Sequence, residues 1–201
     1  MRARPAPTAG PHDAAQTSWY VDDRYYALLE ADVRQWQQEG MPGDEATQRE
    51  CERLLFREAR LLDAGRFREW LDLFADECLY WVPATTGGGA PRREVSLAFD
   101  DRRRLLDRIV RLETGSAWSQ VPPSRTCRLL ANLEVFAGGS ADEARARSTF
   151  VIHESRREVQ RALAGWYGHV LRREAGGWKI ARKMVNLLES GQGLENLSLL
   201  L

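Results

Sequence analysis

The chain has 201 residues, 43% of them hydrophobic, with 29 lysine and arginine residues against 29 aspartate and glutamate residues. A chain of this length can bury one full hydrophobic core but is short for two, so we expect a single domain at residues 19–201. The formal net charge of zero leaves no overall positive field for nucleic acid or anionic lipid. No apolar run of about 18 residues is present, so we expect no transmembrane helix.

The first 18 residues are rich in alanine and proline and lack the apolar segment of a signal peptide. We therefore expect residues 1–18 to be a flexible arm and the protein to be cytoplasmic. A first amphipathic helix is predicted from Trp19 to Gln38, where a glycine and a proline follow. A second helix is predicted to start near Asp44.

The second helix and the segment after it carry the clearest apolar pattern. Apolar residues recur at three- and four-residue steps, the spacing of a helix that buries one face. In the second helix they are Cys51, Leu54, Leu55, Ala59 and Leu62. After Gly65 the same spacing, over Phe67, Trp70, Leu71 and Phe74, predicts a shorter helix. The aromatic segment Cys78–Val82 then predicts a short strand that stops at Pro83.

A central helix is predicted after a capping aspartate, either Asp100 or Asp101, and ends before Gly115. Its arginine run, Arg102–Arg104, is expected to face solvent. The predicted buried stripe consists of Leu105, Leu106, Ile109, Val110 and Leu112.

The second half of the chain has the character of β-structure. Turn-prone sequence separates four extended segments at residues 124–137, 143–156, 162–173 and 178–188, which we expect to be antiparallel neighbours. Helices followed by long strands predict an α+β domain, with its N-terminal helices on one side of a strongly curved, mostly antiparallel sheet. Apolar side chains alternate onto both faces around His169, so one face is expected to pack on helices and the other is open to a partner.

The titratable residues offer few candidates for a metal site. Cys51, Cys78 and Cys127 are scattered, so we expect buried free thiols and neither a disulfide framework nor a zinc site. His153 and His169 lie on successive predicted strands. A hairpin centred on residue 161 would place the two histidines opposite each other, whereas one centred on residue 159 would separate them by about 13 Å. Even the closer register supplies two ligands without a third, which favours ordinary strand histidines.

Glu58 lies on the apolar stripe of the second helix. It is either a general base whose pKa is raised in a pocket or a structural acceptor for arginine and backbone donors. The structural role is favoured because an unpaired buried charge costs several kcal/mol. Trp70, Tyr80 and Trp81 are expected in the core. Gly87–Gly89 is not followed by Lys-Ser/Thr, which indicates a flexible strand connection and not a phosphate loop.

The end of the chain is rich in leucine, and such side chains would favour aggregation unless the sheet or a neighbour covers them. They are therefore candidates for a subunit interface. The residues are Leu197, Leu199, Leu200 and Leu201.

The segment FREARLLDAGRFREWLDLFADECLYWVP resembles the signature of the small, or β, subunit of Rieske-type aromatic-ring-hydroxylating dioxygenases. Three further segments agree in order, and together the four cover most of Glu50 to Leu201. They are DDRRRLLDRIVRLETGSAWSQVPPSRTCRLLANLEV, GWYGHVLRREAGGWKIARKMVNLL and ENLSLLL.

The resemblance implies a cone-like α+β fold related to nuclear transport factor two and scytalone dehydratase. It also implies a non-catalytic subunit that assembles and stabilises the terminal oxygenase, with no cofactor, metal or catalytic residue of its own. The implied partner is a large α subunit with a Rieske [2Fe-2S] cluster and mononuclear Fe(II), in a hexamer of three α and three β subunits. A reductase, often with a ferredoxin, would deliver electrons for the dihydroxylation of an aromatic compound. The chain itself lacks the C-x-H and C-x-x-H ligand pairs of a Rieske cluster.

Two other hypotheses remain, because folds of this kind host many functions. One is a stand-alone isomerase or dehydratase that uses Glu58, Tyr80, His153 or His169 as acid and base. The other is a small-molecule-binding protein.

Overall fold

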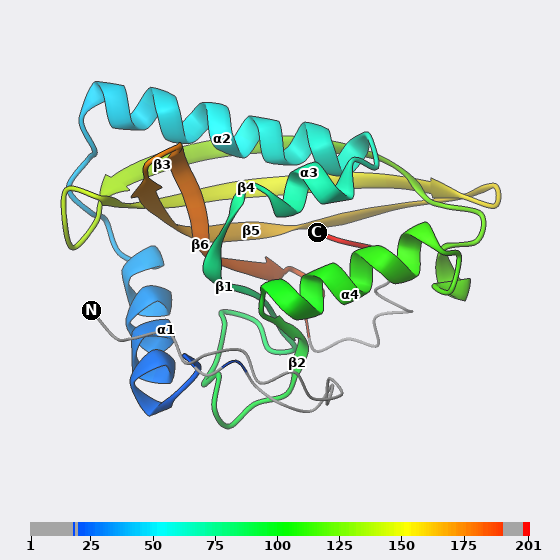
Figure 1. Cartoon of the computed structure of the whole chain (residues 1–201), viewed down its shortest axis with the longest axis horizontal. Helices are drawn as coiled ribbons and strands as arrows, with labels where there is room; N and C mark the ends of the chain where they lie inside the picture. Colours follow the sequence, from blue (N-terminus) through cyan, green and yellow to red (C-terminus); the bar gives the residue numbers. More distant parts are fainter. Residues whose placement is uncertain (1–17, 19, 191–198) are drawn as a thin grey trace.

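The computed structural model describes residues 18, 20–190 and 199–201 (Figure 1). The arm predicted at residues 1–18 lies outside these ranges except for Ser18, and so does Leu197. The described helices are α1 (Asp23–Trp36), α2 (Glu45–Asp63), α3 (Phe67–Leu71), α4 (Arg102–Glu113) and the short 3₁₀ helix η1 (Trp118–Gln120). None of these helices is long and apolar enough to cross a membrane.

The strands form a single six-stranded sheet in the order β2-β1-β6-β5-β4-β3. Their bounds are β1 (Phe74–Pro83), β2 (Ser96–Asp100), β3 (Arg125–Ala137), β4 (Glu143–Arg156), β5 (Val159–Glu174) and β6 (Gly177–Leu187). The last four strands are antiparallel neighbours, as the sequence predicted. Strand β1 pairs parallel with β6 and antiparallel with β2, so the described sheet is mixed.

Aspartate side chains fix the starts of the three longer helices. Asp22, Asp44 and Asp101 each accept a hydrogen bond from a backbone N–H in the first turn of α1, α2 and α4. Such a cap satisfies one of the donors that a helix start leaves unpaired. The predicted start of the second helix near Asp44 is confirmed, and Asp101, not Asp100, caps α4.

The boundary between α3 and β1 differs from the prediction. Helix α3 ends at Leu71, and Phe74 begins the strand instead of ending the helix. The Trp70 and Phe74 rings meet edge to face with centroids 4.9 Å apart, so Phe74 is buried as the helical pattern required, but from a strand. The short strand β2 was not predicted. The Gly87–Gly89 segment connects β1 to β2, as expected of a strand connection.

Helices cover both faces of the sheet, which corrects the prediction of helices on one side. Helix α2 runs along the long strands β3 to β5 (Figure 1), and α2, α3 and α4 contribute to the main core. Helix α1 packs on the opposite face, where Trp36 and Val170 belong to a second core. A Cβ atom at Gly168 would lie 2.5 Å from the Trp36 ring, so this glycine makes the close approach possible.

Helix α4 buries a narrower stripe than predicted. Leu105 and Ile109 are fully buried, but Leu106 and Val110 are each 39% exposed. The preceding arginines do not simply face solvent: Arg102 donates to the main-chain oxygens of Leu71 and Phe74, and Arg104 donates to that of Phe99. A single helix on one surface buries only the i, i+4 row that points into it.

The three cysteines are free thiols, as expected, but only two are buried. Cys51 and Cys78 lie in the core, where burial raises the pKa of each thiol to about 12. Cys127 is exposed, because its neighbours Thr126 and Arg128 on β3 point toward Asp63 of α2 and its own side chain therefore lies on the other face. The prediction of a buried thiol at Cys127 was therefore wrong.

Candidate functional site

Three charged or polar side chains meet inside the core, between α2 and the sheet. We call Glu58, His169 and Lys183 the inner cluster. Lys183 Nζ lies 2.8 Å from one Glu58 carboxylate oxygen, and His169 Nε2 lies 3.2 Å from the other. The indole N–H of Trp70 donates to the first oxygen at 3.1 Å. All three cluster residues are at most 3% exposed.

The register of three neighbouring strands places Tyr80, Lys183 and His169 in one row across the sheet. Lys183 on β6 is paired with Tyr80 on β1 and with His169 on β5. Side chains at paired positions lie on the same face of a sheet, about 5 Å apart. Glu58 reaches the row from α2, on the helix face that also buries Leu55 and Leu62. The cluster therefore ties α2 to the centre of the sheet.

The electrostatics of Glu58 contradict a base with a raised pKa. Burial acts to raise its pKa, but the Lys183 charge and the hydrogen bonds from His169 and Lys183 outweigh burial and lower the pKa to about 2. Burial lowers the pKa of His169, with the Glu58 carboxylate acting in the opposite direction. A neutral imidazole can donate from Nε2 to Glu58. Glu58 is thus an ionised acceptor with three donors.

The partners of Glu58 differ from those predicted. Arginine and backbone donors were expected, whereas the structure supplies lysine, histidine and tryptophan. Sequence reasoning missed Lys183. Its signal is a lysine between Ala181 and Val185, the apolar residues two positions before and after it. The chain has only two lysines among its many arginines. A lysine at an inward-facing position of a strand indicates a buried ion pair, because an unpaired lysine is almost never fully buried.

Tyr80 binds the end of the chain. Its hydroxyl accepts a hydrogen bond from the Leu201 N–H at 2.9 Å and lies 3.3 Å from the Leu201 main-chain oxygen. Lys183 Nζ donates to the same oxygen at 2.9 Å, and Arg128 donates to the Leu200 oxygen at 2.5 Å. Burial raises the pKa of Tyr80, so the phenol stays protonated.

Leu199, Leu200 and Leu201, three of the four candidates for a subunit interface, lie against this chain's own core. Leu200 and Leu201 are 4% and 0% exposed, and Leu199 is half-buried. The sequence left two alternatives, burial of these side chains against the sheet or against a neighbouring subunit. For Leu200 and Leu201 the structure shows burial against the sheet. Their side chains are not exposed for direct contact with another subunit, and the interface role of the segment stays a prediction.

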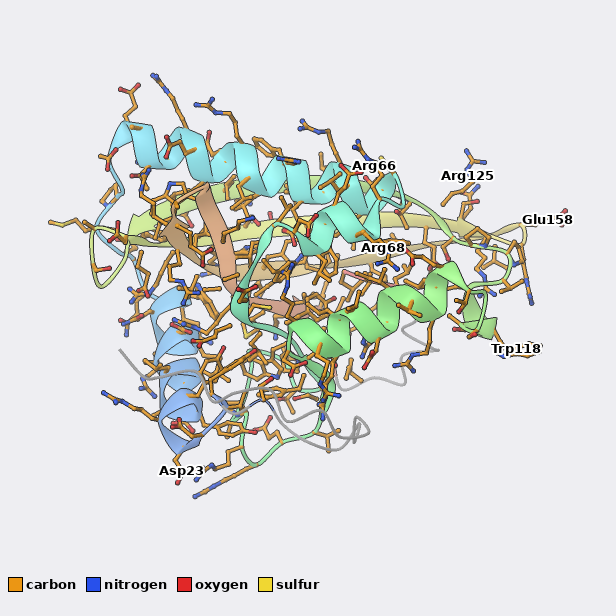
Figure 2. All side chains as sticks on the ribbon, viewed as in Figure 1. Asp23, Arg66, Arg68, Trp118, Arg125 and Glu158 are labelled. Atoms are coloured by element: carbon orange, nitrogen blue, oxygen red, sulfur yellow. The ribbon has the colours of Figure 1, made fainter. Side chains whose placement is uncertain are left out.

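The two strand histidines do not meet. His153 is paired with Ala162, and His169 with Ala146, so seven positions, or about 23 Å, separate the histidines along β4. Both predicted registers were wrong because the hairpin reverses at Arg157 and Glu158, which both have positive φ. Figure 2 shows Glu158 at the tip of the molecule. His153 is exposed, whereas His169 is buried.

Among the described residues, the predicted candidates neither gather as a metal site nor line the small cavity beside Leu62 and Arg128. Within residues 20–190 and at the described ends, no three His, Cys, Asp or Glu side chains gather as a metal site. The described structure contains a small cavity of about 80 Å³, but Glu58, Tyr80 and His169 do not line it. Its walls are Leu62, Phe67, Leu112, Gln120, Pro123, Ser124, Thr126, Arg128, Leu199 and Leu200.

Residues 57–191 match the model of the family described as ring hydroxylating beta subunit. The small oxygenase component of the p-cumate 2,3-dioxygenase system of Pseudomonas putida is 35% identical over 139 residues, which are 68% of this chain and 77% of that protein. The 3-phenylpropionate/cinnamic acid dioxygenase subunit beta of Photorhabdus laumondii is 31% identical over 161 residues, covering 75% and 89%.

Solved structures support the predicted fold. A chain of naphthalene 1,2-dioxygenase aligns with a TM-score of 0.71 at 21% identity, covering 90% of this chain and 100% of that chain. An NTF2-like protein with a cystatin-like fold from Novosphingobium aromaticivorans aligns with a TM-score of 0.52 at 18% identity, covering 86% and 94%. The predicted cone-like α+β fold is confirmed. The family match and the sequence relatives together show that the chain belongs to the ring-hydroxylating β subunits.

Proposed function

We propose that this chain is the non-catalytic β subunit of an aromatic-ring-hydroxylating oxygenase, which it assembles and stabilises by binding a large α subunit. The observation that carries the proposal is the family match over residues 57–191, which spans α2 from Arg57 through the end of β6. A relative that covers 68% of this chain is named a small oxygenase component, and a small component implies a large one.

The redox chemistry is assigned to the large subunit. That subunit would hold a Rieske [2Fe-2S] cluster and mononuclear Fe(II), and it would receive electrons from a reductase and ferredoxin. Three large and three small subunits would form the assembly, which would dihydroxylate an aromatic compound. This chain would contribute a rigid frame and binding surface, and no atom that touches the substrate.

The inner cluster supports a structural role for this chain. Glu58 is ionised and accepts from three donors, so it has little capacity left to act as a base. It is also sealed from solvent, because its side chain is only 4% exposed. A general base must reach the proton it removes, and Glu58 does not line the small cavity beside Leu62 and Arg128. The burial and hydrogen bonding of Glu58 therefore argue against the isomerase or dehydratase alternative.

Co-expression with a candidate large-subunit gene tests the proposal. The two chains should co-purify as one complex that contains iron, whereas this chain purified alone should be iron-free and inactive toward arenes. The large subunit expressed without this chain serves as the control and should be less soluble or less active. Iron or ring-hydroxylating activity in the isolated small chain, or two chains that never co-purify, would overturn the proposal.

A further inference from the structure

Side chains from three different strands hold the main chain of Leu200 and Leu201. Arg128 comes from β3, Tyr80 from β1 and Lys183 from β6. Together they bond both main-chain oxygens of the pair and the Leu201 N–H. These contacts recognise the Leu200–Leu201 amide, through its oxygen and its N–H, and the Leu201 main-chain oxygen, without using the leucine side chains. The interior thus presents a polar site shaped for an amide-like group.

An apolar space surrounds that polar site. The side chains of Leu200 and Leu201 are buried, and Leu199 and Leu200 form one wall of the cavity of about 80 Å³. Leu62, Phe67 and Leu112 contribute apolar side chains to the same cavity. Residues 199–201 and the adjoining cavity therefore form one continuous interior region between the helices and the sheet. Apolar walls with a few convergent polar groups are the usual composition of a small-molecule site.

The donors of this site have charged partners of their own. Lys183 faces Glu58, and Arg128 faces Asp63. The site is thus close to electrically neutral, which suits a neutral amide as well as a carboxylate. The Arg128 side chain is only 2% exposed, and its Nε has no hydrogen-bond partner among the described residues. This buried N–H group can therefore donate a hydrogen bond to one further acceptor oxygen.

We propose that this interior region is a binding site for a small apolar compound that ends in an amide or carboxyl group, and that Leu199–Leu201 occupies it as a built-in plug. A compound of this class and the plug compete for Arg128, Tyr80 and Lys183. The protein with its plug therefore binds such a compound weakly, and loss of the plug exposes the site. The proposal does not depend on which large subunit the chain joins.

The test compares the full-length chain with a chain that ends at residue 198. The probes are N-acetyl-leucyl-leucine and its C-terminal amide, which reproduce the acceptors of Leu200 and Leu201, and N-acetyl-seryl-serine is the polar control. The leucine probes should raise the Tm of the shortened chain by about 5 °C or more at saturation, and the Tm of the full-length chain by much less. The serine probe should change neither.

A second variant locates the binding. Tyr80→Phe in the shortened chain keeps the ring but removes the hydroxyl that contacts Leu201, and should weaken probe binding about tenfold in calorimetry. Equal binding of the acid and the amide identifies the oxygen acceptor as the recognised group, whereas binding of the acid alone restricts the class to carboxylates. If the shortened chain does not fold, a chain that ends at Leu199, which also lacks the main-chain groups of Leu200 and Leu201, replaces it. No binding of either leucine probe to the folded variant, or binding that Tyr80→Phe leaves unchanged, overturns the proposal.

Discussion

Lys183 on β6 and Glu58 on α2 form a buried ion pair with 2.8 Å between Nζ and Oε1, although the two residues lie 125 positions apart in the sequence. The pair joins the long helix of one layer to the centre of the sheet in the other. His169 and Trp70 complete the hydrogen bonding of the carboxylate. A buried ion pair adds little to the free energy of unfolding compared with apolar residues in its place. The loss of one partner is costly, however, because it leaves an unpaired buried charge.

Replacement of Lys183 by methionine should therefore destabilise the protein strongly. The expected loss is about 3–5 kcal/mol of unfolding free energy, because Glu58 would be left ionised without its cation. Urea denaturation monitored by tryptophan fluorescence measures it. Lys179→Met is the matched control, since Lys179 bonds only a main-chain oxygen near the surface, and it should cost less than about 1 kcal/mol. Similar losses for the two lysine variants would contradict the role given to the pair.

Acidification should weaken the folded state through Glu58. Its ordinary pKa of 4.5 falls to about 2 on folding, so the unfolded chain binds the proton first. The stabilisation from Glu58, on the order of 3 kcal/mol, is fully present above pH 4.5 and is lost as the pH falls toward 2. Unfolding free energies measured across this range should decline more steeply for the natural protein than for Glu58→Gln. Parallel curves for the two proteins would refute the low pKa.

His169 should add a second acidic loss at higher pH. Burial lowers its pKa below the ordinary 6.5, so below pH 6.5 the unfolded chain takes up a proton that the folded chain resists. Stability should therefore fall as the pH drops below about 6.5, by at most about 1.4 kcal/mol per pH unit. His169→Asn should remove this part of the pH dependence, and His153→Asn, an exposed site, should leave it intact.

Deletion of Leu197–Leu201 should weaken folding and assembly together. Leu200 and Leu201 are buried, and each buried leucine contributes about 1.5–3 kcal/mol. We expect a lower Tm and, after co-expression with a large subunit, less complex on gel filtration. Leu188→Ser, at a site 71% exposed, is the control and should change neither. An unchanged complex and Tm in the deleted chain would show that the segment supports neither.

Gly168→Ala should loosen α1 from the sheet. The added methyl carbon would lie 2.5 Å from the Trp36 ring, so the helix or the strand must move, at a cost of about 1–3 kcal/mol. Hydrogen exchange in α1 should accelerate. Gly176→Ala is the control, because nothing lies within 4 Å of its added carbon. Unchanged protection of α1 in the Gly168 variant would indicate that Trp36 does not hold the helix in place.

The amino-acid sequence by itself determined most of the helices and long strands, because their formation depends on residues that are close in the sequence. The apolar spacing of Leu55 and Leu62 predicted α2, and turn residues separated the four long strands. The same local patterns carried the resemblance to the ring-hydroxylating β subunits. Periodicity and turn chemistry act over a few residues, so the chain displays them before it folds.

Only the tertiary structure decided which residues meet. The pairing of β1 with β6 places Tyr80 beside Lys183, and the turn at Arg157–Glu158 sets His153 apart from His169. A shift of one residue in either register would turn these side chains to the other face. Register and helix packing are set by the burial of the whole core, so the contacts of Glu58 with Lys183 and His169, and of Tyr80 with Leu201, join residues more than a hundred positions apart.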